Sequence, residues 1–421
     1  MVAAPVTSAC VRRNMTSVET RTSWVVATVS LAVMSIAFGA PYVAVVALKP
    51  IAADVGSARS VPALASALVW LGSGLGGIPL GRLADRFGAR WTVILGAVMI
   101  GAGLWLSTGG QVWQLYVGHG VLMGLLGNAG LNAPLYVYVS RWFDRRRGTA
   151  LALISSGMYV AGTVWPSVFQ TLIEAYGWRE TMVLFGIFEI VTVVPLAAIF
   201  LKAPPAEVHA IADAAARHGR SPAVLGWPPN LVFALLALAS FCCCVPMAMP
   251  QGHLVALCSD LGIPATHGAA MLSVLLGTAF FSRQLWGWIS DRIGGVLTVL
   301  TGAAWQMAAM IALMLTQDEI GLFAVSGLFG LGFAGIIPAY VLAIRELFPA
   351  SEASWRVPAL LLCSGWGMAA GGWLAGRLYD HFGYYAPAFA AGIAFNALNV
   401  ALVGLLALRQ RQSRSQQTAA A

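Results

Sequence analysis

The chain has 421 residues, of which 59% are hydrophobic and only 10% are charged, and its mean hydropathy is +0.79. An average soluble domain carries about 25% charged residues, so this composition excludes an ordinary water-soluble enzyme or binding domain. The formal net charge of +8 would suggest nucleic-acid binding in a soluble protein, but its distribution along this chain indicates membrane topology instead.

Twelve apolar runs, each close to the 20 residues that cross a bilayer, divide the chain. We expect membrane spans at 24–46, 61–80, 91–108, 113–138, 149–171, 181–201, 230–250, 268–288, 297–315, 320–343, 357–376 and 386–408. The linkers between them leave no room for a soluble catalytic domain, and we find no phosphate-binding loop, paired catalytic carboxylates or metal-ligand spacing. The sequence therefore predicts an all-α integral membrane protein that is not an enzyme and has no cofactor or metal.

The first two spans carry backbone signals. Pro41 lies at mid-depth in the first span and predicts a kink that opens backbone carbonyls to a cavity. The second span holds Gly72, Gly74, Gly76 and Gly77, which predicts that a neighbouring helix approaches closely.

Two short polar hinges, at 81–90 and 287–294, repeat at a separation of 206 positions between long apolar runs. The matching residues are Gly81, Asp85, Arg86 and Gly88 in the first hinge and Gly287, Asp291, Arg292 and Gly294 in the second, and the first hinge also contains Arg90. A second pair of related stretches, 127–136 and 332–340, recurs at nearly the same separation. This predicts a parallel repeat of two six-helix bundles, 24–201 and 230–408.

The basic residues indicate how the chain crosses the membrane. Of the 24 Lys and Arg residues, 19 fall on the side of the membrane that holds both termini and four on the other, while Arg283 falls within a span. By the positive-inside rule both termini are cytoplasmic in a multi-pass protein of the cell inner membrane. We expect a disordered cytoplasmic leader at 1–23, a cytoplasmic linker at 202–229 and a disordered cytoplasmic tail at 409–421.

With these features the sequence resembles the major facilitator superfamily over 24–408, and the hinge at 81–90 fits that superfamily's inner-loop signature. A narrower resemblance rests on Tyr138-Val139-Ser140-Arg141-Trp142-Phe143-Asp144-Arg145-Arg146-Arg147-Gly148-Thr149-Ala150, followed by Ser156-Gly157. This stretch is similar to the fifth-helix entry of the monocarboxylate porter and oxalate/formate antiporter branch. The resemblance implies that the hinges latch the two halves on the cytoplasmic side in one state and release them in another.

The same resemblance implies a role for Arg283, which lies eight residues before Asp291, where that branch places a substrate-binding arginine. The chain has Ala279 where the branch's animal members carry an aspartate, and Tyr42 where they carry a lysine. It also lacks, within 357–376, the lysine of the oxalate-type members. We therefore expect a monoanion held by one cation rather than a dianion held by two.

Physical chemistry leaves two interpretations of Arg283. A guanidinium within a span is costly unless it faces water or an anion, so it either binds a carboxylate or snorkels to the inner surface. Four polar residues on kinked helices are further candidates for substrate binding, with interhelical hydrogen bonding as the alternative: Tyr42, Asn132, Tyr136 and Tyr340.

Two buried titratable residues are candidates for proton coupling. His253 follows Pro250 in the seventh span, with Asp260 two turns later on the same face, and Glu189 lies in the sixth span. Either residue could instead be a neutral, packed residue of the helix bundle.

We expect a secondary active transporter that moves a small organic anion, a monocarboxylate, by alternating access with a proton as co-substrate. Its cavity should lie at mid-membrane between spans 1, 4, 5, 7, 8, 10 and 11. An anion exchanger of the oxalate/formate type, an efflux facilitator for amphipathic drugs or another metabolite, and a transport-like sensor are the alternatives. The expected partners are the substrate, the proton and the lipid bilayer, with no nucleic acid, and the expected state is a monomer.

Overall fold

The computed structural model describes residues 19–56, 58–143, 146–202 and 224–420. Helices of the first half are α1 (Arg21–Ala37), α2 (Ala40–Val46), α3 (Leu48–Asp54), α4 (Ser60–Phe87), α5 (Ala89–Ser107), α6 (Val112–Tyr116), the π-helix η1 (Val117–Asn128), α7 (Ala129–Ser140), α8 (Arg147–Ser155), α9 (Gly157–Tyr176) and α10 (Trp178–Phe200). Those of the second half are α11 (Pro229–Asp260), α12 (Ala265–Ile293), α13 (Gly295–Leu315), α14 (Glu319–Phe333), α15 (Ile336–Leu347), α16 (Ala350–Phe382) and α17 (Ala386–Ala420).

All twelve expected spans coincide with helical segments. Eleven segments of the described chain are long and apolar enough to cross a membrane. The remaining span, expected at 113–138, is helical throughout but is divided among α6, η1 and α7. The all-α fold class is therefore confirmed.

The first span breaks where the sequence predicted. Helix α1 ends at Ala37 and α2 begins at Ala40, with Pro41 in its first turn. A proline there has no N–H to lose and cannot continue the preceding helix, so the break falls directly before it. The tenth span breaks in the same way between α14 and α15, on either side of Gly335.

Glycines on α4 allow η1 to approach closely. The sequence predicted such an approach for four glycines, and two of them take part. A Cβ added to Gly72 would lie 2.3 Å from the Gly120 carbonyl oxygen, and one added to Gly76 would lie 2.1 Å from that of Leu125. No larger side chain fits at either position. Gly74 instead faces the Leu362 side chain of α16, and Gly77 faces open space.

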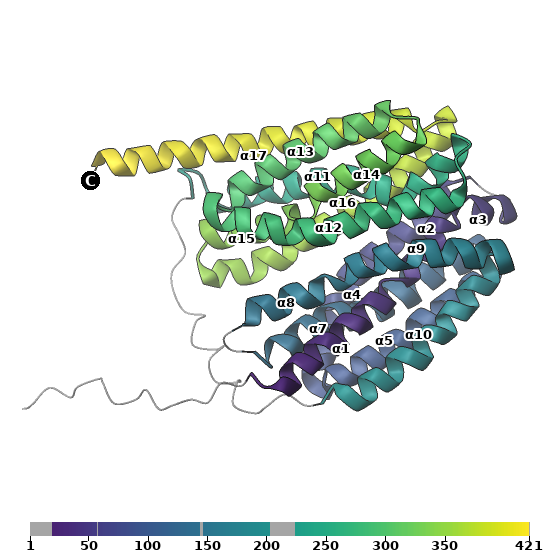
Figure 1. The fold of residues 1–421 in the computed structure, drawn as a ribbon. Coiled ribbons are helices and arrows are strands. Elements are labelled where there is room, and N and C mark those ends of the chain that lie inside the picture. Colours follow the sequence, from purple (N-terminus) through teal and green to yellow (C-terminus); the bar gives the residue numbers. More distant parts are fainter. Residues whose placement is uncertain (1–18, 57, 144–145, 203–223, 421) are drawn as a thin grey trace, which may run out of the picture.

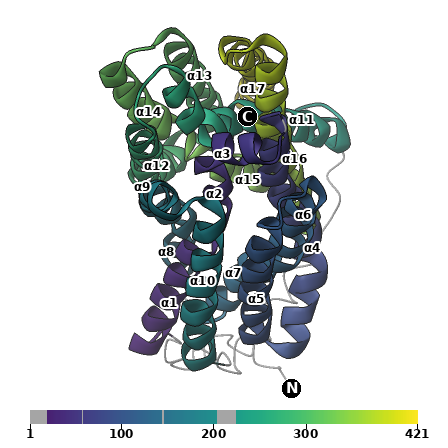
Figure 2. The same ribbon diagram turned by 90° about the vertical axis from the view of Figure 1, so that its right-hand side faces the viewer.

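The helices form two bundles that lie closest at one end and diverge toward the other (Figure 1). We call the end where α1 begins and α17 ends the tail end, and the opposite end, which holds α3, the far end. Viewed from the far end, α2 and α3 lie between the bundles (Figure 2). Helix α4 packs on α16 and α9 packs on α12. The second span thus packs on the eleventh, and the fifth packs on the eighth. Because the second and eighth spans are equivalent in the repeat, as are the fifth and eleventh, the two contacts are related by the repeat.

Each bundle has its own apolar core, and Tyr42 and Met158 pack against both. The boundaries of the two bundles predicted from the sequence, 24–201 and 230–408, stay a prediction. The expected leader and linker fall mostly on residues 1–18 and 203–223, outside the described residues.

One expectation about the tail is wrong. Residues 409–420, expected to be disordered, continue α17 without a break. The stretch contains neither Gly nor Pro, and its Arg, Gln and Ala residues are good helix formers, so nothing in it ends the helix.

Candidate functional site

Arg283 lies on α12 at the contact between the two bundles. Its guanidinium carbon is 5.4 Å from the centre of the Tyr159 ring, which belongs to α9 of the first bundle. The residue is half-buried, and no carboxylate pairs with it within the described part of the chain. The side chain therefore presents an unpaired cation to the space between the bundles.

Two of the candidate polar residues lie on α7 near this cation. The Tyr136 hydroxyl contacts Ser155 of α8 and is within electrostatic range of Arg283. Asn132 precedes Tyr136 by one helical turn, so both share a face of α7. Asn132 is half-buried and makes no hydrogen bond with its side chain among the described residues.

Tyr42 of α2 lies in the same region. Its hydroxyl lies 2.9 Å from the position of a Cβ added to Gly162, one turn along α9 from Tyr159, and it interacts electrostatically with Tyr159. Tyr42, Tyr136, Tyr159 and Arg283 thus surround one space between the bundles.

Tyr340 does not join this group. It is fully buried inside the second bundle, where its hydroxyl donates a 2.5 Å hydrogen bond to Oδ1 of Asn399 on α17. Asn399 in turn donates to Asn396, whose amide donates to the Ala303 carbonyl. The observed contacts of Tyr340 are therefore interhelical hydrogen bonds, the alternative given for it in the sequence analysis.

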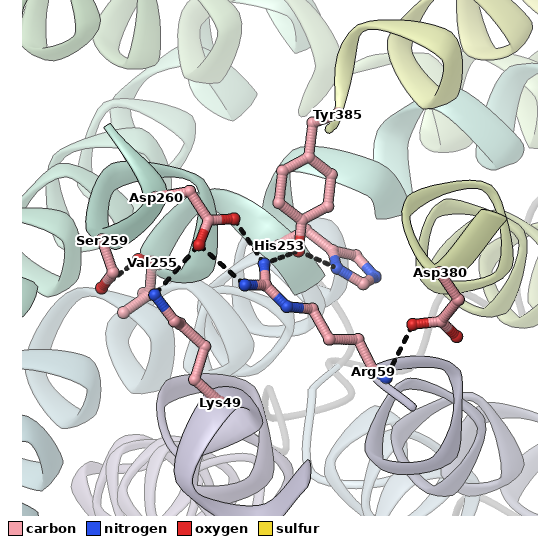
Figure 3. A network of polar contacts seen from close by, with 8 residues as sticks. All are labelled: Lys49, Arg59, His253, Val255, Ser259, Asp260, Asp380 and Tyr385. Atoms are coloured by element: carbon pink, nitrogen blue, oxygen red, sulfur yellow. Dashed lines mark hydrogen bonds and ion pairs between the residues drawn. The ribbon is translucent and has the colours of Figure 1, made fainter. Parts of the chain in front are cut away.

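A network of charges at the far end joins the two bundles (Figure 3). Arg59, directly before α4, donates two hydrogen bonds of 2.5 and 2.7 Å to the carboxylate of Asp260 at the end of α11. Lys49 of α3 donates a third, at 2.9 Å, to the same carboxylate. The Arg59 guanidinium also lies 3.7 Å from the ring centre of Tyr379. We call this set of contacts, together with Asp380, Tyr385 and His253 described below, the far-end network.

Asp380 of α16 caps a helix of the other bundle. Its carboxylate accepts hydrogen bonds from the backbone N–H groups of Arg59 and Ser60, at 2.8 and 2.9 Å. Helix α4 has no cap from its own N-terminal side chain. The first N–H groups of a helix have no partner within the helix, and its dipole is positive at that end. The negative carboxylate of Asp380 therefore makes a favourable contact between the two bundles.

His253 connects this network to the interior. Its Nδ1 lies 3.0 Å from the Tyr385 hydroxyl and its Nε2 lies 2.8 Å from the Gly372 carbonyl oxygen. A carbonyl only accepts, so Nε2 carries the hydrogen and Nδ1 accepts from Tyr385. Tyr385 accepts in turn from Arg59 at 3.1 Å. Burial alone lowers the pKa of Arg59, yet its hydrogen bonds to Asp260 and Tyr385 raise that pKa above its usual value, so the cation is permanent.

Glu189, the second candidate for proton coupling, lies apart from this network. It is fully buried in α10, and neither carboxyl oxygen has a hydrogen-bond partner within the described residues. An unpartnered buried carboxyl group is far cheaper to keep neutral than charged. This environment suits a protonated packing residue of the first bundle.

The two hinges have equivalent backbones and are shorter than the sequence suggested. Gly88 (φ +90°) ends α4 and begins α5, while Gly294 (φ +80°) ends α12 and begins α13. Such φ values suit glycine. Gly81, Asp85 and Arg86 lie within the last turns of α4, and Gly287, Asp291 and Arg292 within those of α12.

The hinge side chains contact their own bundles. Asp85 accepts a 2.8 Å bond from Arg141 at the end of α7. Arg90 donates to the Ala198 carbonyl of α10. Arg292 stacks on Trp288, and Glu346 accepts from the Gly295 N–H at 3.0 Å. The first hinge is thus tied to the fourth and sixth spans and the second to the tenth, each within its own half.

A cavity of about 70 Å³ lies between the bundles, directly inside the far-end network. Its walls come from spans 1, 2, 5, 7 and 11, and include Tyr42, Trp70, Met158, His253 and Met368. The expected site was to include spans 4, 8 and 10 as well. Those spans do not line this cavity; the fourth and eighth contribute Tyr136 and Arg283 further toward the tail end.

Comparison with known proteins agrees with this architecture. The family model described as Major Facilitator Superfamily matches residues 24–277 and again 236–421. The chain belongs to the major facilitator superfamily.

Several relatives of this superfamily member are described as transporters. The chain is 26% identical over 294 residues to the MFS-type transporter pynF of Aspergillus niger, covering 68% of this chain and 65% of that protein. It is 26% identical over 335 residues to monocarboxylate transporter 13 of Bos taurus, covering 76% and 74%. In fold it is similar to a bacterial homologue of the human lysosomal transporter Spinster in an inward-facing and occupied conformation, with a TM-score of 0.67, 17% identity and coverage of 92% and 97%.

Sequence reasoning missed most of the far-end network of this major facilitator protein. Lys49 and Arg59 were counted only as outer-side charges, and Asp380 and Tyr385 were not singled out. One signal was present: Asp380 lies 206 positions after Glu174, and both precede the repeated glycine, Gly177 or Gly383, by three residues. Tyr159, which lies under Arg283, carries no comparable signal.

Proposed function

We propose that this transporter moves a small organic monocarboxylate by alternating access and that Arg283 binds the carboxylate. The observation that carries the proposal is the unpaired guanidinium over Tyr159 between the two bundles. A planar guanidinium donates two parallel hydrogen bonds to one carboxylate, and an unpaired charge at this depth is retained at a cost of several kcal/mol unless an anion or water meets it. Tyr42, Tyr136 and Asn132 supply hydroxyl and amide groups for the remaining contacts.

The alternating motion would separate the bundles at the far end. In the conformation described here the far-end network joins the bundles, while Asp85 pairs with Arg141 inside its own bundle. We infer that the tail end is the open side and that release of the far-end network exposes the site to the opposite side. Re-formed contacts between hinge residues and the other bundle would close the tail end.

Proton coupling would act through His253. The chain of donors from Arg59 to Tyr385 to His253 needs a neutral imidazole whose Nδ1 accepts. A proton on Nδ1 would direct two donors, Arg59 and His253, at one tyrosine oxygen and leave the Tyr385 hydroxyl hydrogen without its acceptor. Protonation therefore favours opening of the far end, which couples proton entry to substrate exchange there.

We also propose that the tail end faces the cytoplasm of the cell inner membrane and that the protein works as a monomer. The bias of basic residues toward the tail end supports this orientation.

The test is uptake by purified protein in liposomes, with labelled monocarboxylates from acetate to phenylalkanoates, with and without a pH gradient. Arg283→Gln is expected to lower uptake at least 100-fold, and Arg283→Lys to keep part of it because the charge remains without the fork. Arg345→Gln, an exposed arginine on α15, is the matched control and should leave uptake unchanged. Full uptake by Arg283→Gln would reject the proposal, and uptake that needs a counter-anion but no pH gradient would favour exchange.

A further inference from the structure

The cavity inside the far-end network has the chemistry of an apolar subsite. Its lining is mainly hydrocarbon, aromatic and thioether, and none of the described residues that form it is a Lys, Arg, Asp or Glu. Its aromatic residues include Phe38 and Trp70, one from each of the first two spans. Met158 and Met368 face it from opposite bundles, and a flexible thioether adapts to varied apolar shapes.

Three of the polar side chains that line this cavity already have hydrogen-bond partners in the protein, and the hydroxyl of a further one, Tyr42, lies toward Gly162 and the anion site. Ser66 donates to the Pro62 carbonyl at 3.2 Å, and the Gln251 amide donates to the Met247 carbonyl at 3.0 Å. Both nitrogens of His253 are engaged by Tyr385 and Gly372. A charged or strongly hydrated group that passed beyond Tyr42 into this cavity would lose water and meet side chains whose hydrogen bonds are already made, which is unfavourable.

Two residues relate the cavity to the anion site. Met158 lines the cavity, and its neighbour Tyr159 lies under Arg283. Tyr42 also lines the cavity while its hydroxyl reaches down to Gly162. A ligand held by Arg283 therefore extends past Tyr42 into the cavity.

The length and volume of this path limit the ligand. Counted from the far-end termini of α11 and α12 at about 1.5 Å per residue, His253 and Arg283 are roughly 16 Å apart along the bundle axis, and their side chains shorten the gap. One water needs about 10–15 Å³ on this measure of volume, so a cavity of about 70 Å³ holds roughly five water-sized groups, the size of a ring or a short branched chain.

Resting on the proposed function, we propose that the substrate is an amphipathic monocarboxylate, with its carboxylate on Arg283 and an apolar body of about six to ten carbons ending in the cavity beneath the far-end network. Acids of two or three carbons reach Arg283 but leave the cavity empty. Burial of each further methylene raises affinity by up to about fourfold until the cavity is full.

Two glycines allow the cavity to be filled selectively. Gly252 and Gly372 line it, and a Cβ added to either meets no atom within 4 Å, so a larger side chain has room to enter without displacing the backbone. Gly404 on α17 also has space, with the nearest atom at 3.9 Å, but does not line the cavity. Gly372→Leu is the test variant, Gly252→Leu the second, and Gly404→Leu the matched control.

The experiment is calorimetric titration of the purified full chain with acetate, butanoate, hexanoate, octanoate and 5-phenylpentanoate. Titration of Arg283→Gln protein supplies the heat of partitioning into detergent, which is subtracted. We expect octanoate and 5-phenylpentanoate to bind at least tenfold more tightly than acetate. Gly372→Leu should weaken these two about tenfold and leave acetate unchanged, and Gly404→Leu should match the unaltered chain.

The outcomes separate the two proposals. The proposal of an amphipathic substrate would be overturned if all acids of the series bound with equal affinity. It would also be overturned if monodisperse Gly372→Leu and Gly252→Leu proteins bound the long acids as tightly as the unaltered chain. In both cases Arg283 would keep its role. If no acid gave a binding heat that is lost in Arg283→Gln, both the proposed anion site and this inference would be overturned.

Discussion

At the scale of single residues, His253 and Glu189 are both buried and titratable, but their surroundings differ. His253 lies in the cavity wall, hydrogen-bonded to Tyr385, near the cation of Arg59 and the carboxylate of Asp380. Glu189 has no polar partner in the described chain and does not line the cavity. Of the two, it is the histidine that contacts the network joining the bundles, which supports its proposed role in proton coupling.

This difference predicts opposite results for two conservative substitutions. His253→Gln keeps a polar side chain but removes the imidazole proposed to take up the proton, so uptake should become independent of the pH gradient while substrate binding stays within about twofold. Glu189→Gln keeps shape and neutrality, so both uptake and its response to the gradient should persist. Initial rates in liposomes at several imposed gradients measure this, and a gradient response in His253→Gln would assign coupling elsewhere.

Sequence alone predicted the position of Arg283 but not its partner. A guanidinium in an apolar run is detectable because its burial is costly, whereas Tyr159 is one of 10 tyrosines with nothing in its local pattern to mark it. Tyr340 was grouped with Tyr42 because both lie near a helix break. The direction of a side chain depends on which neighbouring helix supplies a partner, here Asn399, and local sequence does not contain that information.

At the scale of elements, the breaks in spans one and ten were predictable because Pro41 and Gly335 act on their own backbone. The π-helix η1 was not, since its glycines also fit an ordinary α-helix. The close packing of α4 on η1 was readable from the glycine run, although only Gly72 and Gly76 of the four take part.

The packing of α4 on η1 yields a prediction with a neighbouring control. Gly76→Ala would place a Cβ 2.1 Å from the Leu125 carbonyl oxygen and force the helices apart, which should cost about 1–3 kcal/mol. Gly77→Ala meets no atom within 4 Å and should be neutral or slightly stabilising, since Ala favours helix by about 1 kcal/mol. Thermal unfolding in detergent compares them. Equal melting temperatures for the two variants would show that α4 and η1 do not constrain each other.

At the scale of the whole molecule, the two bundles are joined unequally along their length. The ion pairs that link them in the described chain lie at the far end and converge on Asp260. The repeat does not reproduce this arrangement: Asp380 caps α4 from the other bundle, but its counterpart Glu174 accepts from Gln170 of its own helix. A parallel repeat places equivalent residues at the same end of the molecule, so an exact duplication would have given a second cap at the far end, from Glu174 to the start of α12. Divergence after duplication left one of these two contacts.

Asp260 should therefore control the balance between conformations. The Arg59 and Asp260 side chains are only 13% and 22% exposed, so their two hydrogen bonds are better shielded than a surface pair. Asp260→Asn removes the charge that holds both Arg59 and Lys49, which should weaken far-end closure by about 1–2 kcal/mol, or roughly tenfold in population. The readout is the rate at which an impermeant maleimide, added on the far-end side, labels a cysteine placed at Gln251 in the cavity wall.

The control for this measurement is Glu180→Gln, an exposed carboxylate in the first turn of α10 that takes no part in the network. It should leave the labelling rate unchanged. Substrate added on the far-end side should protect the cysteine in the Asp260→Asn protein, because the open conformation then exposes the path to Arg283. Labelling that is equally slow in both variants would mean that apolar contacts between α4 and α16, rather than charge, keep the far end closed.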